Sequence, residues 1–363
     1  MLLYQIALSL VKEIGPVNGK KLVAYMGSSK AIFEGDRKKL ADIPGISKKL
    51  MAELKSKEPL LKAEQEIKYL EKHNIKPLFY TDKEYPQRLR HCADSPIMLY
   101  FRGNADLNHR RALAMVGTRN ATEYGKSMTE KIIEDLKGTD VMIISGLAFG
   151  IDSYAHKYAL KHNMPTLGVI AHGHDKMYPA QNRNLASKML EQGGVISEFA
   201  HGIIPEKNMF PRRNRVIAGM SDATVVVESA QKGGALITAE LANSYSRDVF
   251  AVPGKSYDNY SKGCNALIKR NIAALIDSGE DIRKMMNWDI QDERIRNHQR
   301  KLFLELTPEE KMITDKLKIN GPSTIDWLAV ETNMPSSKLS SILLKLEFNG
   351  LLKSLPGSQY QLL

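Results

Sequence analysis

Short apolar runs alternate with amphipathic stretches between residues 76 and 288. Many runs are bounded by glycine, and stretches of helical period separate them. This rhythm predicts a mainly parallel β-sheet with helices on both faces, because strands buried on both sides are apolar throughout. The fold class is therefore doubly wound α/β. The predicted strands are 112–117, 141–145, 166–171, 194–198, 223–228, 248–254 and 273–276, with edge strands at 76–80 and 97–101. The predicted helices are 122–137, 151–162, 181–191, 235–246 and 264–270.

Residues 1–70 precede the sheet and predict short helices broken by glycine turns. The segments 13–26 and 42–54 each contain a glycine turn followed by a helix with a lysine pair. This pattern is typical of a helix-hairpin-helix, in which backbone N–H groups at the helix start hold a phosphate. A small helical bundle whose glycines only make tight turns fits at least as well, because two short matches are weak evidence.

The end of the chain has a different pattern. Residues 289–304 contain few apolar residues and predict a linker. The TPEE segment at 307–310 is a capping box that opens a helix, and two further helical stretches and a short terminal hairpin follow it. The predicted domains are a helical domain (1–70), the α/β core (71–288), the linker, and a winged-helix domain (305–363).

Charge is uneven along the 363 residues, which carry a formal net charge of +11. Residues 301–363 hold seven basic and seven acidic side chains, so the whole excess lies before them. A basic excess favours a polyanionic partner. No apolar stretch is long enough for a spanning helix, and Cys92 and Cys264 are too few for a disulfide framework. These features predict a cytoplasmic protein without membrane association.

Three glycine-containing loops follow predicted strands, where open α/β sheets bind ligands. The first is Gly117-Thr118-Arg119, and the second contains Ser145 and Gly146. The third places Gly233 and Gly234 at a helix start, with Thr238 and Glu240 in the first turns. Helix N-termini favour anions, but neither a dinucleotide fingerprint nor a Walker sequence is present. The loops therefore predict phosphate binding, although Arg119 could also simply face solvent.

The densest cationic cluster is KNMFPRRNR at 207–215. Arginine matches phosphate geometry, and an exposed aromatic side chain can stack on an unpaired base. Because Pro211 disfavours a helical conformation for the residue before it, Phe210 is expected in a loop, as a stacking platform. Alternatively, Phe210 belongs to the core and some of the arginines pair with Glu198 or Glu228. The cationic members of the cluster are Lys207, Arg212, Arg213 and Arg215.

Two groups of titratable residues remain. Asp152 and His156 are four residues apart on one helical face, as an acid/base pair or, more simply, as a hydrogen-bonded structural pair. His172, His174 and Asp175 lack further ligands at metal-binding spacing. A turn leading to a Tyr-Pro step explains them better, and no metal or cofactor is expected.

Taken together, the motifs GTR, SGLAFGID with AH, YP, SE, FPRRNR, GGALITA, VPG and GCNALI follow the order and spacing of the DNA-processing protein A family (DprA, also called Smf). The resemblance covers about residues 80–280. It implies a Rossmann-like core that binds single-stranded DNA, forms a homodimer and helps to load RecA in natural transformation, with a helix-hairpin-helix or SAM-like domain before it. The chain departs from the family where SGSLITA is replaced by GGALITA, so backbone donors must replace serine hydroxyls there.

The resemblance also implies that Ala148 shapes the phosphate track together with the glycines. The residues expected to bind DNA are Gly117, Thr118, Arg119, Ser145, Gly146, Ala148, Lys207, Phe210, Arg212, Arg213, Asn214, Arg215, Lys232, Gly233, Gly234 and Thr238. None is expected to be catalytic.

Two other functions remain as alternatives. KGGALITAE resembles the motif of lysine-decarboxylase-like nucleotide hydrolases, which would use Glu240 to cleave a nucleotide. Lys232 and Leu236 depart from that motif, and the flanking domains are not typical of that family. A sequence-specific regulator acting through the winged helix is disfavoured by that domain's zero net charge. A non-enzymatic DNA-binding protein therefore fits best.

Overall fold

The computed structural model describes residues 1–44, 46–288, 306–349, 351–355 and 359–362, so the predicted linker 289–304 lies outside the described residues. The chain divides into two compact units, Met1–Met286 and Asn287–Leu363.

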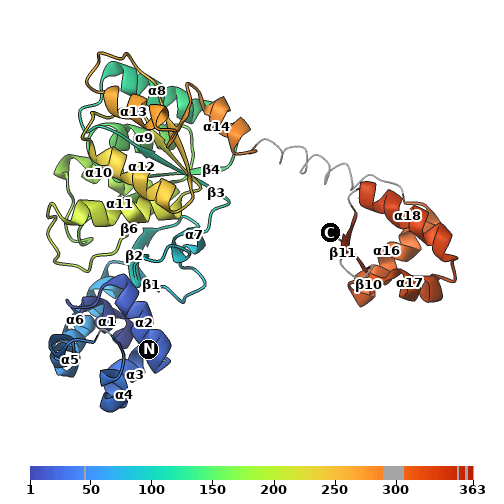
Figure 1. Ribbon diagram of the computed structural model, residues 1–363, viewed down its shortest axis with the longest axis horizontal. Coiled ribbons are helices and arrows are strands. Elements are labelled where there is room, and N and C mark those ends of the chain that lie inside the picture. The colour runs from blue at the N-terminus through green and yellow to red at the C-terminus, as the bar shows by residue number, and fades with distance from the viewer. Residues whose placement is uncertain (45, 289–305, 350, 356–358, 363) are drawn as a thin grey trace. The chain divides into compact units, whose positions relative to one another are not determined.

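A nine-stranded sheet forms the centre of the first unit (Figure 1). Its order is β1-β2-β6-β5-β4-β3-β7-β8-β9. Strands β3 to β9 pair in parallel, whereas β2 is antiparallel to both β1 and β6. The predicted mainly parallel sheet is confirmed. Its strands are β1 (Lys76–Phe79), β2 (Met98–Gly103), β3 (Arg111–Val116), β4 (Val141–Ser145), β5 (Thr166–Ile170), β6 (Gly193–Ser197), β7 (Ala223–Val226), β8 (Asp248–Ala251) and β9 (Ala274–Leu275).

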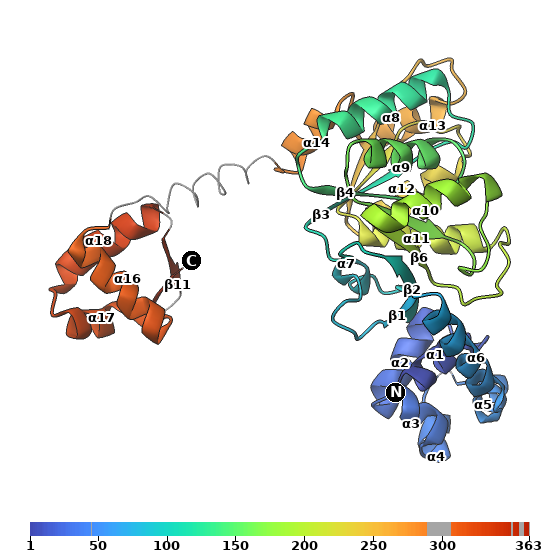
Figure 2. The same ribbon diagram turned by 180° about the vertical axis from the view of Figure 1, so that it is seen from behind.

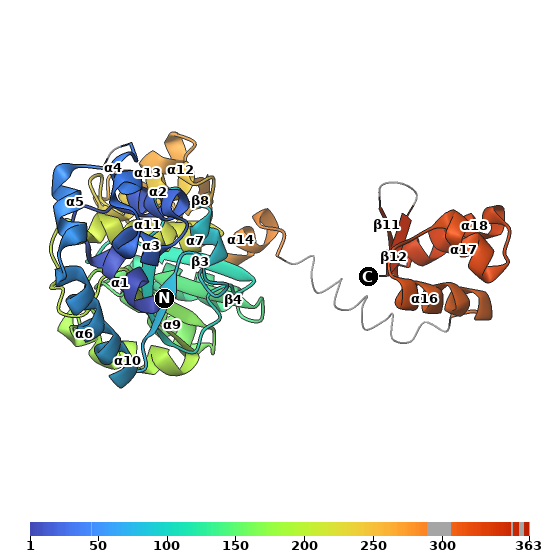
Figure 3. The same cartoon turned by 90° about the horizontal axis from the view of Figure 1, so that it is seen from below.

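The sheet reverses its winding direction at β3, which pairs with β4 on one side and β7 on the other. Such a switch point opens a crevice beyond the carboxyl ends of the strands. Helices α9 and α10 cover one face of the sheet, and α11 and α12 cover the other (Figures 2 and 3). The helices of this part are α7 (Gln87–Arg90), α8 (Glu123–Asp135), α9 (Ile151–Lys161), α10 (Arg183–Gln192), α11 (Met209–Met220), α12 (Gly234–Ser244), α13 (Lys262–Lys269) and α14 (Gly279–Met285), with a short 3₁₀ turn at Ala180–Asn182.

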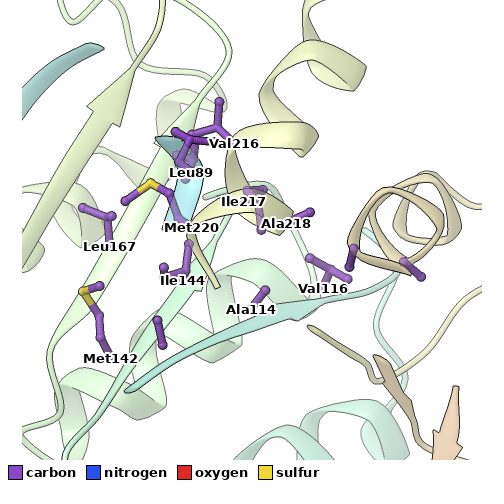
Figure 4. Packing of buried hydrophobic residues seen from close by; sticks show 14 of the residues in the cluster. Leu89, Ala114, Val116, Met142, Ile144, Leu167, Val216, Ile217, Ala218 and Met220 are labelled. Atoms are coloured by element: carbon purple, nitrogen blue, oxygen red, sulfur yellow. The ribbon is translucent and has the colours of Figure 1, made fainter. Parts of the chain in front are cut away.

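An apolar core between the sheet and α11 fixes the position of that helix (Figure 4). Val116 of β3 and Ile144 of β4 belong to the same buried cluster as Val216, Ile217 and Met220 of α11. Burying such side chains contributes about 1.5–3 kcal/mol each. The beginning of α11 is thereby held at the carboxyl edge of the sheet.

Helix α11 corrects the prediction that Phe210 lies in a loop. The helix begins at Met209, so Phe210 and Pro211 are both in its first turn. Proline is tolerated there because the first N–H groups of a helix have no intrahelical partner. The buried apolar face further along α11 outweighs the weak local preference of a residue that precedes proline.

Six helices precede the sheet and share a buried cluster with Met98 and Tyr100 of β2. In the turn before the second helix, the backbone N–H groups of Lys12 and Glu13 donate to the Glu53 carboxylate at 2.7 and 3.4 Å. These hydrogen bonds tie the chain before the second helix to the helix that contains Glu53. The helices are α1 (Leu2–Leu10), α2 (Pro16–Met26), α3 (Ser29–Glu34), α4 (Arg37–Ala41), α5 (Lys48–Lys55) and α6 (Glu58–Lys72).

The second unit has the predicted winged-helix architecture. A capping box between Thr307 and Glu310 opens its first helix, as the sequence predicts. Three helices pack with a small sheet of order β10-β12-β11. The elements are α16 (Pro308–Asn320), β10 (Ser323–Thr324), α17 (Ile325–Thr332), α18 (Ser336–Phe348), β11 (Leu352–Leu355) and β12 (Gln359–Leu362).

Candidate nucleic-acid interface

A cleft of about 240 Å³ lies at the carboxyl edge of the sheet, beside the switch point. The end of β3, the start of α9, the first turns of α11 and the start of α12 form its walls. Of the predicted residues, the cleft brings together Gly117, Thr118, Arg119, Ala148, Phe210, Arg213, Asn214, Gly233, Gly234 and Thr238.

Close backbone packing shapes the loop after β3. A Cβ atom on Gly117 would lie 2.5 Å from the Ile151 side chain, so only glycine fits there. The N–H of Thr118 donates to the Glu228 carbonyl at 2.8 Å, and its carbonyl accepts from the N–H of Ile151 at 3.2 Å. This double anchor holds the next residue, Arg119, exposed at the mouth of the cleft.

Arg119 and Phe210 meet at that mouth. The Arg119 guanidinium carbon lies 5.2 Å from the centre of the Phe210 ring, within the range of a cation–π contact. The Tyr178 ring, 48% exposed, lies 6.0 Å from the Phe210 ring. Phe210 is only partly buried and also lines a neighbouring hollow with Phe149 and Tyr178. The pair thus offers a cation and an aromatic face side by side.

Beneath this pair, Arg213 is buried and bound within the protein. Its Nη1 donates to the Val169 carbonyl at 3.3 Å and lies 3.8 Å from an oxygen of Asp152. Asp152 also accepts the N–H groups of Gly146 and Ala148 at 3.1 and 3.4 Å. Burial raises the pKa of this carboxyl, although Arg213 and the two N–H groups oppose the rise. Arg213 therefore supports the cleft floor, and its charge is largely balanced there.

Gly146 serves this buried ion pair rather than a ligand. A Cβ atom on Gly146 would lie 1.3 Å from Nη1 of Arg213, so its missing side chain makes the space that the guanidinium occupies. Ser145 is also unavailable to DNA, because it is fully buried and its hydroxyl donates to the Met115 carbonyl at 2.6 Å. Ser145 therefore does not bind DNA as expected, and Gly146, expected to shape the phosphate track, instead makes room for Arg213.

Two of the predicted arginines lie on the opposite side of α11. Arg212 and Arg215 both pair with the buried Glu198 carboxylate, the former at 3.3 Å. Arg212 also stacks over Phe199 at 4.9 Å. Residues three apart, such as Arg212 and Arg215, share a helix face. Because this segment begins a helix, its arginines are divided between two faces, whereas a loop could have kept them together. The alternative that some of these arginines pair with Glu198 is correct.

The start of α12 forms the far wall. Gly233 is its N-cap, and a Cβ atom on Gly234 would meet nothing within 4 Å. The Asn214 side-chain amide donates to the Gly234 carbonyl at 3.4 Å and ties α11 to this turn. The first N–H groups of such a helix attract anions. Lys207 and Lys232 are exposed and do not line the cleft.

Glu240, the residue that the hydrolase alternative would use for catalysis, does not line the cleft. Its side chain is 55% exposed and lies 3.7 Å from Arg270. The acidic residue that lines the cleft is Asp152, which Arg213 already holds. This arrangement gives the hydrolase alternative no support.

The remaining titratable residues have structural partners. His156 does not bond to Asp152, and its Nδ1 instead lies 2.7 Å from the Thr166 hydroxyl. Burial lowers the pKa of His156 to about 3, so its ring is neutral. The N–H of Tyr178 donates to Nε2 of His172 at 3.2 Å, which holds the predicted turn before Pro179.

The other two members of the histidine segment are also engaged. His174 Nε2 lies 2.9 Å from the Tyr100 carbonyl, and Asp175 accepts the N–H of Gly202 at 2.8 Å. Within the described ranges, no group of three or more histidine, cysteine or acidic residues could hold a metal ion. Among the same residues, no helix has the length and apolarity that crossing a membrane requires.

Sequence reasoning missed two aromatic residues at the site, Phe149 and Tyr178. Both are more than two-fifths exposed and flank Phe210 in the hollow beside the cleft. The Tyr-Pro step and the aromatic residue in SGLAFG were visible signals, but their proximity to Phe210 depends on the sheet order.

Two family models match the chain. DNA recombination-mediator protein A matches residues 76–287, and the DprA winged helix domain matches residues 304–358. Protein Smf of Synechocystis sp. is 32% identical over an alignment of 394 residues that covers 99% of this chain and 98% of that protein. DNA processing protein DprA of Streptococcus pneumoniae is 40% identical over 201 residues, 55% of this chain and 71% of that protein.

Solved structures agree with these matches. The X-ray structure of DNA processing protein A from Streptococcus pneumoniae superposes with a TM-score of 0.63 at 31% identity, covering 78% of this chain and 97% of that one. A structure of DNA processing protein A from Helicobacter pylori, described as showing a single-stranded DNA binding mode, has a TM-score of 0.54 at 27% identity over 59% of this chain and 96% of that one. The chain therefore belongs to the DNA processing protein A (DprA, or Smf) family.

Proposed function

We propose that this protein binds single-stranded DNA in the cleft at the switch point and catalyses no reaction there. The observation that carries the proposal is the Arg119–Phe210 pair at the mouth, 5.2 Å apart, beside the N-terminus of α12. Arginine provides a phosphate contact and phenylalanine a stacking face, and these are the two components of single-strand recognition. The single-strand binding described for the Helicobacter pylori relative supports the same ligand.

The geometry favours a single strand over a duplex. Phe210 lies at the mouth of a narrow cleft rather than on a flat surface. A base can reach it only when it is unstacked from its neighbours, and unstacking a paired base costs a few kcal/mol. Stacking on an aromatic side chain returns about 1–3 kcal/mol for a base that is already free.

Within the proposed site, the predicted residues have different roles. Arg119 and the N–H groups at the start of α12 contact phosphates, and Phe210 stacks on a base. Gly117, Ala148, Gly233 and Gly234 allow the strand to approach closely, while Asn214 and Thr238 complete the walls. The exposed Lys207 and Lys232 add positive charge outside the cleft.

Membership of the family supports the wider role. We propose that the protein is cytoplasmic, acts as a homodimer formed through the α/β core, and assists RecA in loading onto single strands during natural transformation. A direct test measures RecA assembly on DNA coated with a single-strand-binding protein, with and without this chain. Unchanged assembly would exclude the loading role and leave DNA binding itself intact.

The central test compares fluorescence anisotropy of labelled oligo-dT with that of a duplex of equal length at physiological salt. We expect clear preference for the single strand, and we expect Arg119→Ala to weaken binding of every sequence about equally. The salt slope is the change in the logarithm of the binding constant with the logarithm of the salt concentration. As a phosphate contact, Arg119 should account for about 0.7 units of this slope. Glu240→Gln is the matched control, since an exposed acid outside the cleft should not reduce affinity. Equal affinity for both DNA forms would refute the proposal.

A further inference from the structure

A second and larger groove begins beside the cleft and runs between α9 and α10, which lie side by side (Figure 2). Its volume is about 1100 Å³. Five residues of α9 line one wall, and they share one helix face: Ser153, Tyr154, Lys157, Leu160 and Lys161. The wall from α10 and the turn before it is mainly polar, with Gln181, Asn184 and Lys188.

The groove is continuous with the proposed site. Phe149 lines both the groove and the hollow that contains Arg119 and Phe210. Gly150, the next groove residue, packs so closely on the loop after β3 that a Cβ atom would lie 2.6 Å from the Arg119 carbonyl. A strand that passes Phe210 therefore meets Phe149 next, and then the start of α9.

The wall formed by α9 combines an aromatic ring with cations. Tyr154 lines the groove, and the Lys157 ammonium lies 5.3 Å from the centre of its ring. Tyr158 and Lys126 do not line the groove but support this ring from outside it, with Tyr158 stacked at 6.1 Å and Lys126 at 5.4 Å. An aromatic ring beside cations suits a strand that offers bases for stacking and phosphates for counter-charges.

The available charge is positive but comes from few residues. Lys126 and Lys161 are paired with Glu123 and Glu130. Lys157 and Lys188 are exposed and form no ion pair with any residue that the structure describes. Glu191 is the acidic side chain among the groove residues. The two unpaired lysines are therefore the side chains with charge to offer a phosphate.

We propose that the α9–α10 groove is an extension site for the same single strand that the cleft binds. The inference rests on the proposed function and adds the path of the strand beyond Phe210. Helix α9 has 11 residues, about 16 Å of length, which is long enough to contact several nucleotides of a strand. The groove should bind any base sequence, because lysines contact phosphates and an aromatic ring stacks on every base without a base-specific pattern.

The test compares short and long oligonucleotides. Lys157→Ala/Lys188→Ala should leave the affinity for oligo-dT of about 6 nucleotides unchanged and weaken oligo-dT of about 20 nucleotides roughly tenfold. The salt slope for the long strand should fall by about 1.4 units, or 0.7 for each lost phosphate contact. Lys137→Ala/Lys269→Ala is the matched control, because both lysines are exposed and lie outside the groove.

Failure of this inference is distinguishable from failure of the proposed function. If wild-type protein binds neither oligonucleotide, the proposed function is wrong. If the wild-type protein binds both oligonucleotides, and the groove variant loses the same affinity for both lengths or loses affinity for neither, the groove is not an extension site. Equal losses in the control variant would likewise refute it, because they would indicate general attraction. If a polyglutamate peptide displaces the short oligonucleotide as well as the long one, general attraction of anions would account for binding, and this outcome would also overturn the inference.

Discussion

Removal of the Phe210 side chain separates a stacking role from a structural one. The residue is partly buried in the first turn of α11, and its ring centre lies 5.2 Å from the Arg119 guanidinium carbon and 6.0 Å from the Tyr178 ring centre. Neither partner belongs to the buried apolar core of the sheet. Phe210→Ala should therefore cost less stability than the 3–5 kcal/mol typical of a core phenylalanine, because the side chain is only partly buried and lines both the cleft and the hollow beside it.

Phe210→Ala should have its main effect on the affinity for single-stranded DNA. Loss of one stacked base costs about 1–3 kcal/mol, which corresponds to roughly 5- to 150-fold in the dissociation constant. The cation–π contact with Arg119 contributes about 0.5–1 kcal/mol in the free protein, and its loss also frees the guanidinium from its position over the ring. We therefore expect Phe210→Ala to lower the affinity for oligo-dT about tenfold or more.

Fluorescence anisotropy with oligo-dT, together with thermal melting, decides between the roles. Phe210→Trp should retain binding and Phe210→Leu should not, since leucine preserves apolar volume without a stacking face. Tyr257→Ala is the control for loss of an exposed aromatic ring, as Tyr257 is 76% exposed and outside the cleft. If Phe210→Ala melts far below wild type and binds normally when folded, or if leucine equals phenylalanine, the stacking argument is wrong.

Three further predictions concern other parts of the chain. Deletion of residues 301–363 should leave single-strand affinity within tenfold, because that segment has no net charge and electrostatics dominates sequence-independent binding; anisotropy on a folded truncation checks this. Gly146→Ala should lower the free energy of unfolding in urea by about 3 kcal/mol or more, since it displaces Arg213 from a buried carboxylate, whereas Gly234→Ala should cost little; equal losses would contradict the packing argument. The free energy of unfolding should fall as the pH drops from about 6.5 towards 3, because His156 stays neutral in the folded state and takes up a proton only on unfolding; His156→Gln should reduce that slope, and an unchanged slope in chemical denaturation would exclude this cause.

Much of the fold could be predicted because parallel strands give a strong local signal. The apolar runs at 141–145 and 166–171 correspond to β4 and β5 almost residue for residue. The helices between the runs start within a few residues of the predicted positions. Helices α7, α11 and α14 have no counterpart among the predicted helices; for α11, a local rule about proline was applied to a segment whose position depends on Val216 and Ile217, further along the same helix.

The site was less predictable, because its residues depend on which face of an element they occupy. The glycine loops were found from their position after strands, and Arg119 and Phe210 do meet at one mouth. The burial of Ser145 and the pairing of Arg213 with Asp152 depend on neighbouring strands that the sequence does not order. Tyr178 reaches Phe210 for the same reason.

The helical start of α11 also changes the expected electrostatics of DNA binding. If residues 207–215 formed a loop, the four cations of that segment and Arg119 could all contact phosphates, which would give a salt slope of about −3.5 on a single strand. In the structure, Arg213 is held by Asp152, and Arg212 and Arg215 share Glu198. Arg119 is then the cationic side chain left at the mouth of the cleft, so a short oligonucleotide should show a slope nearer −1. Affinity for a short strand thus depends more on stacking and backbone N–H groups than the basic sequence suggests, and a slope near −3.5 would show that the buried arginines rearrange to meet the DNA.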